Sequence, residues 1–351
     1  MNQNIDNEIS NKRAFSPSDA GIAFILCLVV PQVVVLLLYV LFGGAIQGVM
    51  LVSALVPQLC FFSVYVFVTR KKRLNFKTAT ALNFKINIWV LLLVLLVGIV
   101  AMFGFSPLIN LFDTITSGWG YKSSVANIDV STFWKFFASI FYVALLPAIC
   151  EELVFRGIIA NGFKKYGTVT AVVLSAVLFA LMHQNLQQLV YQLFLGGVMA
   201  YIVIKTGSII YTMLLHFFNN FVILLSAHLF GEEEANVNLS NAWEIIKPIL
   251  IAICAVLIIV GILWLINYVL KRERAKKQNQ IANAEQSSPN LNENKVQTEI
   301  AKNNDQRKGI LLESMDRADR QTKFYKNPYV VSAIVIGIVF WILVVISMFK
   351  A

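Results

Sequence analysis

Six polar residues lie inside otherwise apolar stretches of the chain, and their types and spacing are suited to hydrolytic chemistry. They are Glu151, Glu152, Arg156, His183, His216 and Asn220. An ionisable group in the core of a bilayer is costly unless it is paired or hydrated, so each marks a candidate functional site. Glu with His can deprotonate a water molecule, whereas His with Asn can donate hydrogen bonds to a developing oxyanion. Together these groups suit the hydrolysis of an amide bond.

The first motif is Glu-Glu-Leu-Val-Phe-Arg at residues 151–156, shortly after a predicted helix kink at Pro147. Glu152 and Arg156 are four residues apart, so they share a helix face and can form an ion pair. Glu151 points elsewhere and has no obvious partner on its own helix. The alternative interpretation is a buried ion pair that only orients helices.

The other motifs should reach the same depth in the membrane. If the chain turns near Tyr166, Glu151 lies 15 residues before that turn and His183 lies 17 after it. At about 1.5 Å per residue, these positions are ~22 and ~25 Å from the turn. His216 and Asn220 share a face of a later helix, ~15 and ~21 Å from its own cytoplasmic end. We therefore expect three helices to bring these polar groups to one level.

The residues leave two other types of chemistry open. Glu151, His183 and His216 supply three ligands of the kind that catalytic zinc uses, but no HExxH helix accompanies them. Ser175 and Ser208 have suitable depths for a nucleophile, but neither lies in a nucleophile motif.

The composition is that of an integral membrane protein. Of the 351 residues, 58% are hydrophobic and only 14% are charged. About 20 apolar residues are needed to cross a bilayer, and roughly nine such runs are present. The sequence therefore predicts an all-α, polytopic helical bundle with about eight core transmembrane helices and one extra C-terminal transmembrane helix. The predicted spans lie near 21–43, 48–69, 88–109, 137–162, 168–184, 187–204, 208–230, 246–269 and 329–349.

Lys and Arg gather in alternate loops, as the positive-inside rule requires. This pattern predicts a multi-pass protein of the cell membrane with a cytoplasmic N-terminus. The net charge of +10 follows from this topology and from contact with anionic lipid headgroups, so nucleic acid is not an expected partner. The four cysteines fall within spans and are expected to be apolar core residues.

The chain divides into four predicted parts. Residues 1–20 form a cytoplasmic segment, and residues 21–269 form the transmembrane core, with catalytic motifs at 151–220. Residues 270–328 are a polar cytoplasmic linker whose composition cannot form a core of its own. Residues 329–351 contain the C-terminal transmembrane helix.

The motifs EExxxR, FxxxH and HxxxN, in this order, resemble those of the CAAX-protease and bacteriocin-processing family of intramembrane endopeptidases. They stand at 151–156, 179–183 and 216–220, and the resemblance covers roughly residues 135–230. Ser208, eight residues before His216, also fits the family pattern. The resemblance implies an all-helical membrane core whose catalytic chamber opens to the cytoplasm and to lipid.

The resemblance also implies roles for individual residues. Glu151 and His183 would activate water, and His216 and Asn220 would stabilise the oxyanion. Glu151 is preferred over the second Glu of the motif because that residue pairs with the Arg four residues later.

Glu152 and Arg156 would then mainly hold the site together. A metal-free mechanism is favoured because Asn is a poor zinc ligand and a good oxyanion donor, although zinc stays open.

The leading hypothesis is a glutamate- or metal-dependent CAAX-type protease that cleaves a membrane-associated protein or peptide. Its expected partners are membrane lipids and that substrate. The alternative is a non-enzymatic immunity or scaffold protein in which the polar cluster only ties helices together. A proton-coupled transporter is disfavoured because we find no internal repeat.

Overall fold

The computed structural model describes residues 14–43, 50–76, 80–122, 128–231, 237–287 and 323–349. Within these ranges the regular elements are all helical, as the sequence predicts. Eight of the helices are α2 (Pro17–Phe42), α3 (Met50–Lys71), α5 (Ile88–Gly118), α9 (Thr168–Met182), α10 (Leu189–Thr206), α11 (Ile210–Phe230), α12 (Ala242–Ser287) and α14 (Pro328–Met348).

Between α5 and α9, the helical stretch Phe133–Tyr166 carries the first motif. Its regular α-helix is interrupted twice by π-helical turns. In order, its segments are α6 (Phe133–Ser139), η2 (Ile140–Leu145), α7 (Leu146–Glu152), η3 (Leu153–Ala160), α8 (Asn161–Phe163) and η4 (Lys164–Tyr166).

Seven helices within the described residues are long and apolar enough to cross a membrane. This agrees with a polytopic membrane bundle. Helix α9 is apolar but has only 15 residues, and α3 is not among the seven. The expected number of spans and the domain boundaries therefore stay predictions. Helix α12 continues to Ser287, so the first part of the predicted linker is helical, whereas its residues 288–322 lie outside the described ranges.

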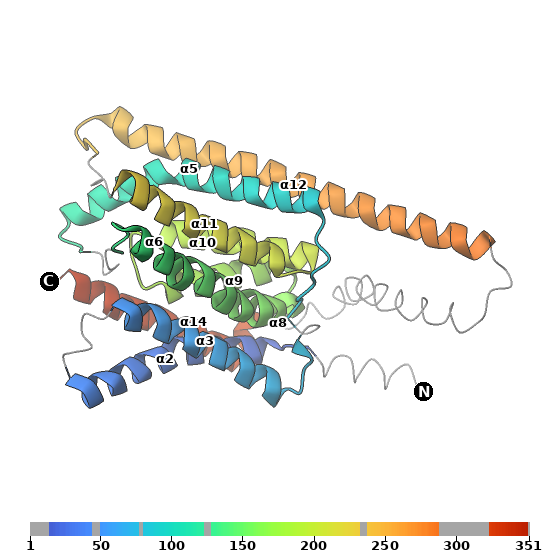
Figure 1. Cartoon of the computed structure of the whole chain (residues 1–351), viewed down its shortest axis with the longest axis horizontal. Helices are drawn as coiled ribbons and strands as arrows, with labels where there is room; N and C mark the ends of the chain where they lie inside the picture. Colours follow the sequence, from blue (N-terminus) through green and yellow to red (C-terminus); the bar gives the residue numbers. More distant parts are fainter. Residues whose placement is uncertain are drawn as a thin grey trace.

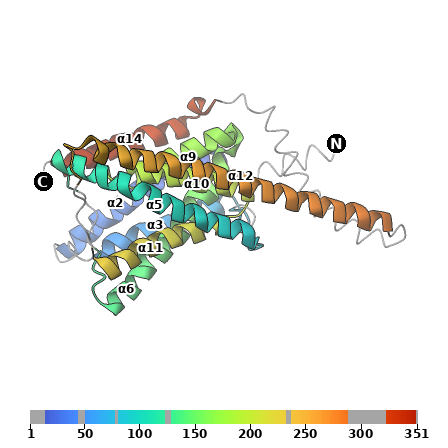
Figure 2. The ribbon, with the colours of Figure 1, turned by 90° about the horizontal axis from the view of Figure 1, so that it is seen from above.

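The motif-bearing stretch Phe133–Tyr166 lies between α11 and α3 in Figure 1, whereas Figure 2 shows its first segment, α6, at the edge of the bundle. Helices α2, α3, α9, α10 and α11 all pack against parts of this stretch. Every residue of η3 is buried. Helices α5 and α12 lie side by side on one flank, and α2, α3 and α14 lie on the other. The first motif is thereby placed in the protein interior rather than against lipid.

Helix starts are set by residues that satisfy the free N–H groups of the first turn. At α2, Ser16 and Asp19 form a capping box, and Pro17 occupies the first helical position. At α14, the Asn327 side chain accepts from the backbone N–H groups of Tyr329 and Val330.

The C-terminal helix α14 is part of the bundle rather than an appendage. It packs against α2 and α9. Its residues Val330 and Ala333 are fully buried. A Cβ atom added at Gly21 of α2 would lie only 2.4 Å from the carbonyl oxygen of Tyr329. The two backbones therefore approach as closely as small residues permit in membrane helices.

Candidate active site

Pro147 lies directly after the π-helical segment η2, at the predicted irregularity of the motif-bearing helix. Proline has no N–H, so it cannot donate to the carbonyl of Val143 four residues earlier. The side-chain amide of Asn220 on α11 donates to that carbonyl instead, with Nδ2 3.0 Å from the oxygen. Helix α11 is thereby joined to the turn that precedes the Glu pair. Interruptions of this π type are frequent at functional sites.

Glu152 and Arg156 form the ion pair that their spacing predicts. Arg156 Nη1 lies 2.9 Å from Glu152 Oε1, and both side chains are completely buried. The guanidinium carbon also lies 4.2 Å from the centroid of the Phe179 ring, within cation–π range. Through the contact between Arg156 and Phe179, the ion pair joins the motif-bearing helix to α9, which contains the FxxxH motif.

His216 stands between the two carboxylates of the first motif. Its Nδ1 lies 3.1 Å from Glu152 Oε1, and its Nε2 lies 4.0 Å from Glu151 Oε2. A carboxylate accepts hydrogen bonds, so Nδ1 carries the hydrogen and donates to Glu152. Glu152 thereby fixes the orientation of the ring and turns Nε2 toward Glu151. The EExxxR and HxxxN motifs thus meet through direct contacts.

Glu151 is the carboxylate that remains accessible. Its side chain is 12% exposed, against 0% for Glu152. Glu151 Oε1 accepts a 2.9 Å hydrogen bond from Nε2 of Gln58 on α3, which is itself buried. Gln58 is absent from the residues predicted from sequence. The sequence feature that could have identified Gln58 is its polar amide side chain next to Pro57, inside an otherwise apolar helix.

His183 ends α9, and its ring is half-buried. Nδ1 lies 2.9 Å from the Phe179 carbonyl oxygen, which can only accept, so the neutral ring has its lone pair on Nε2. No ion-pair contact within 4.0 Å joins His183 to Glu151 in the described part of the chain, but the two interact electrostatically. The Phe179 ring lies edge-on to both His183 and His216, so one aromatic side chain separates the two imidazoles.

The amide of Asn220 is oriented by a chain of hydrogen bonds from α10. The hydroxyl of Tyr191 donates to Asn219 Oδ1 at 2.5 Å, and Asn219 Nδ2 donates to Asn220 Oδ1 at 3.2 Å. Asn219 is buried and bonds to Tyr191 of the neighbouring helix. These hydrogen bonds leave Nδ2 of Asn220 directed at Val143, and its second hydrogen has no acceptor among the described residues.

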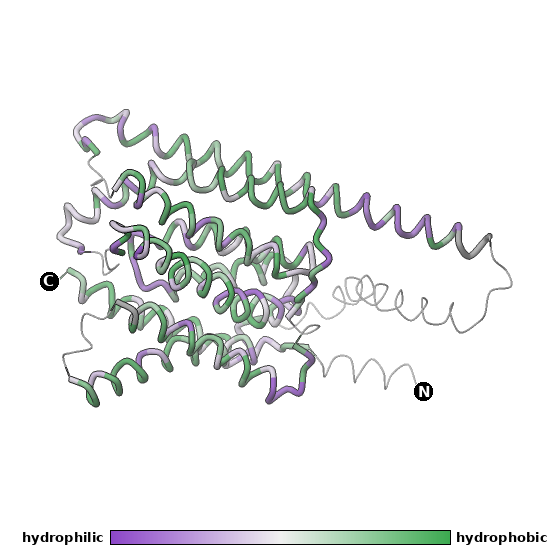
Figure 3. Tube along the Cα trace, viewed as in Figure 1, coloured by the Kyte–Doolittle hydropathy of each residue, from purple (hydrophilic) through white to green (hydrophobic). Residues whose placement is uncertain are grey.

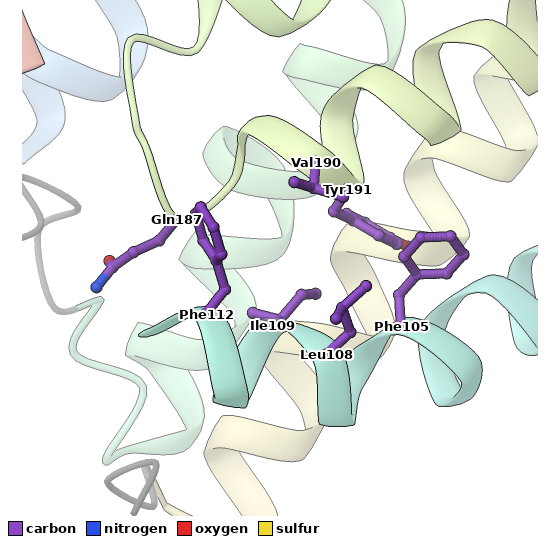
Figure 4. Close-up of a pocket in the computed structure, with 7 residues that line it drawn as sticks. All are labelled: Phe105, Leu108, Ile109, Phe112, Gln187, Val190 and Tyr191. Atoms are coloured by element: carbon purple, nitrogen blue, oxygen red, sulfur yellow. The ribbon is translucent and has the colours of Figure 1, made fainter. Parts of the chain in front are cut away.

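A small apolar cleft of about 60 Å³ lies beyond Tyr191, between α5 and α10 (Figure 4). Its size suits a few water molecules at most. The cleft is lined by Phe105, Leu108, Ile109, Phe112, Gln187, Val190 and Tyr191.

The remaining polar residues have local roles. Ser208 donates to the carbonyl of Asn83 at 2.7 Å and accepts from the backbone of Ile210, so it fixes the start of α11. His228 lies 2.6 Å from the Val130 carbonyl oxygen, near the end of α11. Ser175 is fully buried within α9. None of these contacts is that of an activated nucleophile.

The donor groups do not fit a metal centre. Among the described residues, no three His, Cys, Asp or Glu side chains are arranged to hold one ion. The metalloprotease alternative therefore gains no support from the geometry.

Comparison with known proteins bears on the family. No curated protein and no solved structure matches the chain. Residues 133–222 match the family model described as type II CAAX prenyl endopeptidase Rce1-like. This range begins at α6, ends within α11, and contains all six predicted site residues. The chain therefore carries an Rce1-like domain at residues 133–222, and the resemblance predicted from its motifs is confirmed.

Proposed function

We propose that this protein is an intramembrane endopeptidase in which Glu151 is the general base toward water. The observation that carries this proposal is the setting of Glu151. It is the more accessible carboxylate of the Glu pair, it is held on one side by Gln58, and it faces His216 Nε2 at 4.0 Å on the other. The Rce1-like domain supports the same class of reaction.

The cluster carries one net negative charge when both histidines are neutral, from Glu151, Glu152 and Arg156. The proton that water releases therefore leaves the cluster without net charge.

In the proposed reaction, a water molecule within reach of Glu151 Oε2 gives a proton to that carboxylate as its oxygen attacks the carbonyl carbon of the substrate. Glu151 passes this proton to His216 Nε2, and the tetrahedral oxyanion accepts hydrogen bonds from the second N–H of Asn220 and from the protonated Nε2. The C–N bond then breaks as the proton passes from His216, through Glu151, to the leaving nitrogen. His183 Nε2 supplies a second basic nitrogen near this path. Water and the peptide bond thus yield a carboxylic acid and an amine.

The chain's own residues suffice for these steps, and none requires zinc or another cofactor. The proposed substrate is a protein or peptide associated with the membrane, cleaved near the cytoplasmic leaflet. We propose that the protein lies in the cell membrane with its N-terminus in the cytoplasm and that membrane lipids surround it as partners.

The test compares membrane and secreted peptides by mass spectrometry in cells that make wild type, Glu151→Gln or Glu244→Gln at equal levels. Glu244 lies in the first turn of α12, away from the site, and its variant is the matched control. Fragments present with wild type and the control but absent with Glu151→Gln are expected. Identical peptides in all three would overturn the proposal.

One observation favours a second candidate, a non-enzymatic immunity or scaffold protein. Glu152 and Arg156 are completely buried and contact residues of α9 and α11, so the cluster also ties helices together. A scaffold predicts that the biological effect of Glu151→Gln follows protein level alone. An enzyme predicts loss of the effect at normal protein level.

A further inference from the structure

A basic pocket of about 190 Å³ lies where the end of α10 meets α12, far from the Glu pair in sequence. It is lined by Lys205, Asn267, Leu270, Lys271 and Arg274. Three of these five side chains are cationic, and none is acidic. The site described above uses none of them.

The pocket is built by contacts between the two helices. Arg274 Nη2 donates to the carbonyl of Lys205 at 3.1 Å, at the last turn of α10. Asn267 Nδ2 lies 2.5 Å from the hydroxyl of Tyr201. Lys205 Nζ lies 5.7 Å from the centroid of the Tyr201 ring. These contacts hold the walls together and keep the three cationic groups around one opening.

The depth of the pocket is that of lipid headgroups. The apolar run of α12 from Pro248 to Ile266 extends about 28 Å, close to the thickness of the hydrocarbon core. The charged run that begins at Lys271 follows soon after, and the far part of α12 is largely hydrophilic (Figure 3). Exposed Trp264 and Tyr268 stack at the same level, as aromatic side chains do at membrane interfaces.

The positive charge of the pocket has no counter-charge in ion-pair contact among the described residues. Lys205, Lys271 and Arg274 have no ion-pair partner in the part of the chain that the structure describes. The adjacent carboxylate, Glu273, pairs with Lys276 at 3.9 Å instead. An anion supplied from outside would therefore satisfy three cations at once.

We propose that this pocket binds the phosphate of an anionic phospholipid headgroup, while the acyl chains lie along the apolar surface of α12. Basic pockets between transmembrane helices take anionic headgroups, and each cation near the surface contributes about fivefold in affinity. A free phosphate ion shares this headgroup chemistry but lacks the acyl chains. The proposal does not depend on the proposed protease activity.

The experiment titrates the full-length protein in mild detergent with phosphatidylglycerol, phosphatidylcholine or inorganic phosphate, and counts bound molecules by native mass spectrometry. Wild type is compared with the triple variant Lys205→Gln, Lys271→Gln and Arg274→Gln. The matched control, Arg272→Gln with Lys276→Gln and Lys277→Gln, removes the same charge from α12 outside the pocket.

Wild type and the control should bind one phosphatidylglycerol at least about tenfold more tightly than the pocket variant. They should also prefer it to phosphatidylcholine. An equal loss of affinity for phosphatidylglycerol in both triple variants would show that the lipid is attracted by the overall positive charge of α12. That result would overturn the proposed binding pocket. Phosphate that binds as tightly as the lipid would overturn the lipid assignment. Lys271→Gln alone should weaken phosphatidylglycerol binding about fivefold. Because Lys271 is exposed, this single variant should fold normally and keeps the test informative if the triple variant misfolds.

Discussion

Gln58 on α3 donates a hydrogen bond of 2.9 Å to Glu151 Oε1, across 93 residues of sequence. Gln58 lies outside the region that matches the family model, whereas Glu151 lies inside it. The carboxylate proposed as general base is thus oriented by a helix that the catalytic motifs do not include. The Oε1 atom of Gln58 is also buried and makes no hydrogen bond within the described residues.

Replacing Gln58 by Leu should lower kcat more than it changes KM. Hydrogen bonds to charged groups are worth about 1.5–3 kcal/mol, so the expected loss in kcat is roughly 10- to 150-fold. The measurement is steady-state cleavage by purified protein of a substrate found by peptide profiling. Gln192→Leu, at a half-buried position on α10, is the control. A Gln58→Leu enzyme with wild-type kcat would remove Gln58 from the mechanism.

Glu151 and Glu152 are adjacent but should respond differently to the same substitution. Glu151→Gln should abolish cleavage and leave the melting temperature in detergent nearly unchanged. Glu152→Gln should destabilise the fold by about 3–5 kcal/mol, because it leaves Arg156 buried without its counter-ion. Thermal melting and cleavage assays on both variants check this. Equal destabilisation by the two substitutions would contradict the division of roles.

These contacts differ in how far sequence could predict them. The Glu152–Arg156 pair follows from spacing on one helix, and the common depth of Glu151, His183 and His216 follows from counting helical rise. The Gln58 contact depends on how α3 packs against α7, which no local pattern encodes. The packing of α14 on α2 could not be predicted for the same reason, since it depends on the close approach at Gly21.

Asn220 has two separable roles, and Pro147 provides the means to separate them. Asn220→Ala should cost about 1–3 kcal/mol of stability, because the Val143 carbonyl loses its donor. Adding Pro147→Ala restores a backbone N–H that can bond that carbonyl, so the double variant should recover stability. Activity should stay low if Asn220 also donates to the oxyanion. Recovery of both stability and kcat would make Asn220 a structural residue only.

Removal of metal should leave cleavage intact. The proposed steps use Glu151, His183, His216 and Asn220 without a metal ligand. Dialysis against EDTA and phenanthroline, followed by elemental analysis and assay, checks this. Activity that falls on chelation and returns specifically with zinc would contradict the metal-free mechanism.

The contact between α2 and α14 can be tested with a matched pair of glycines. Gly21→Ala places a Cβ atom 2.4 Å from the Tyr329 carbonyl oxygen, whereas a Cβ at Gly261 of α12 meets nothing within 4 Å. Overpacking of this kind costs about 1–3 kcal/mol, so Gly21→Ala should lower the melting temperature in detergent. Gly261→Ala should be neutral or slightly stabilising, because Ala favours helix over Gly. Because α2 also packs against η3, which follows the Glu pair, Gly21→Ala should reduce cleavage as well. Unchanged melting of Gly21→Ala would show that α14 does not contact α2 as described.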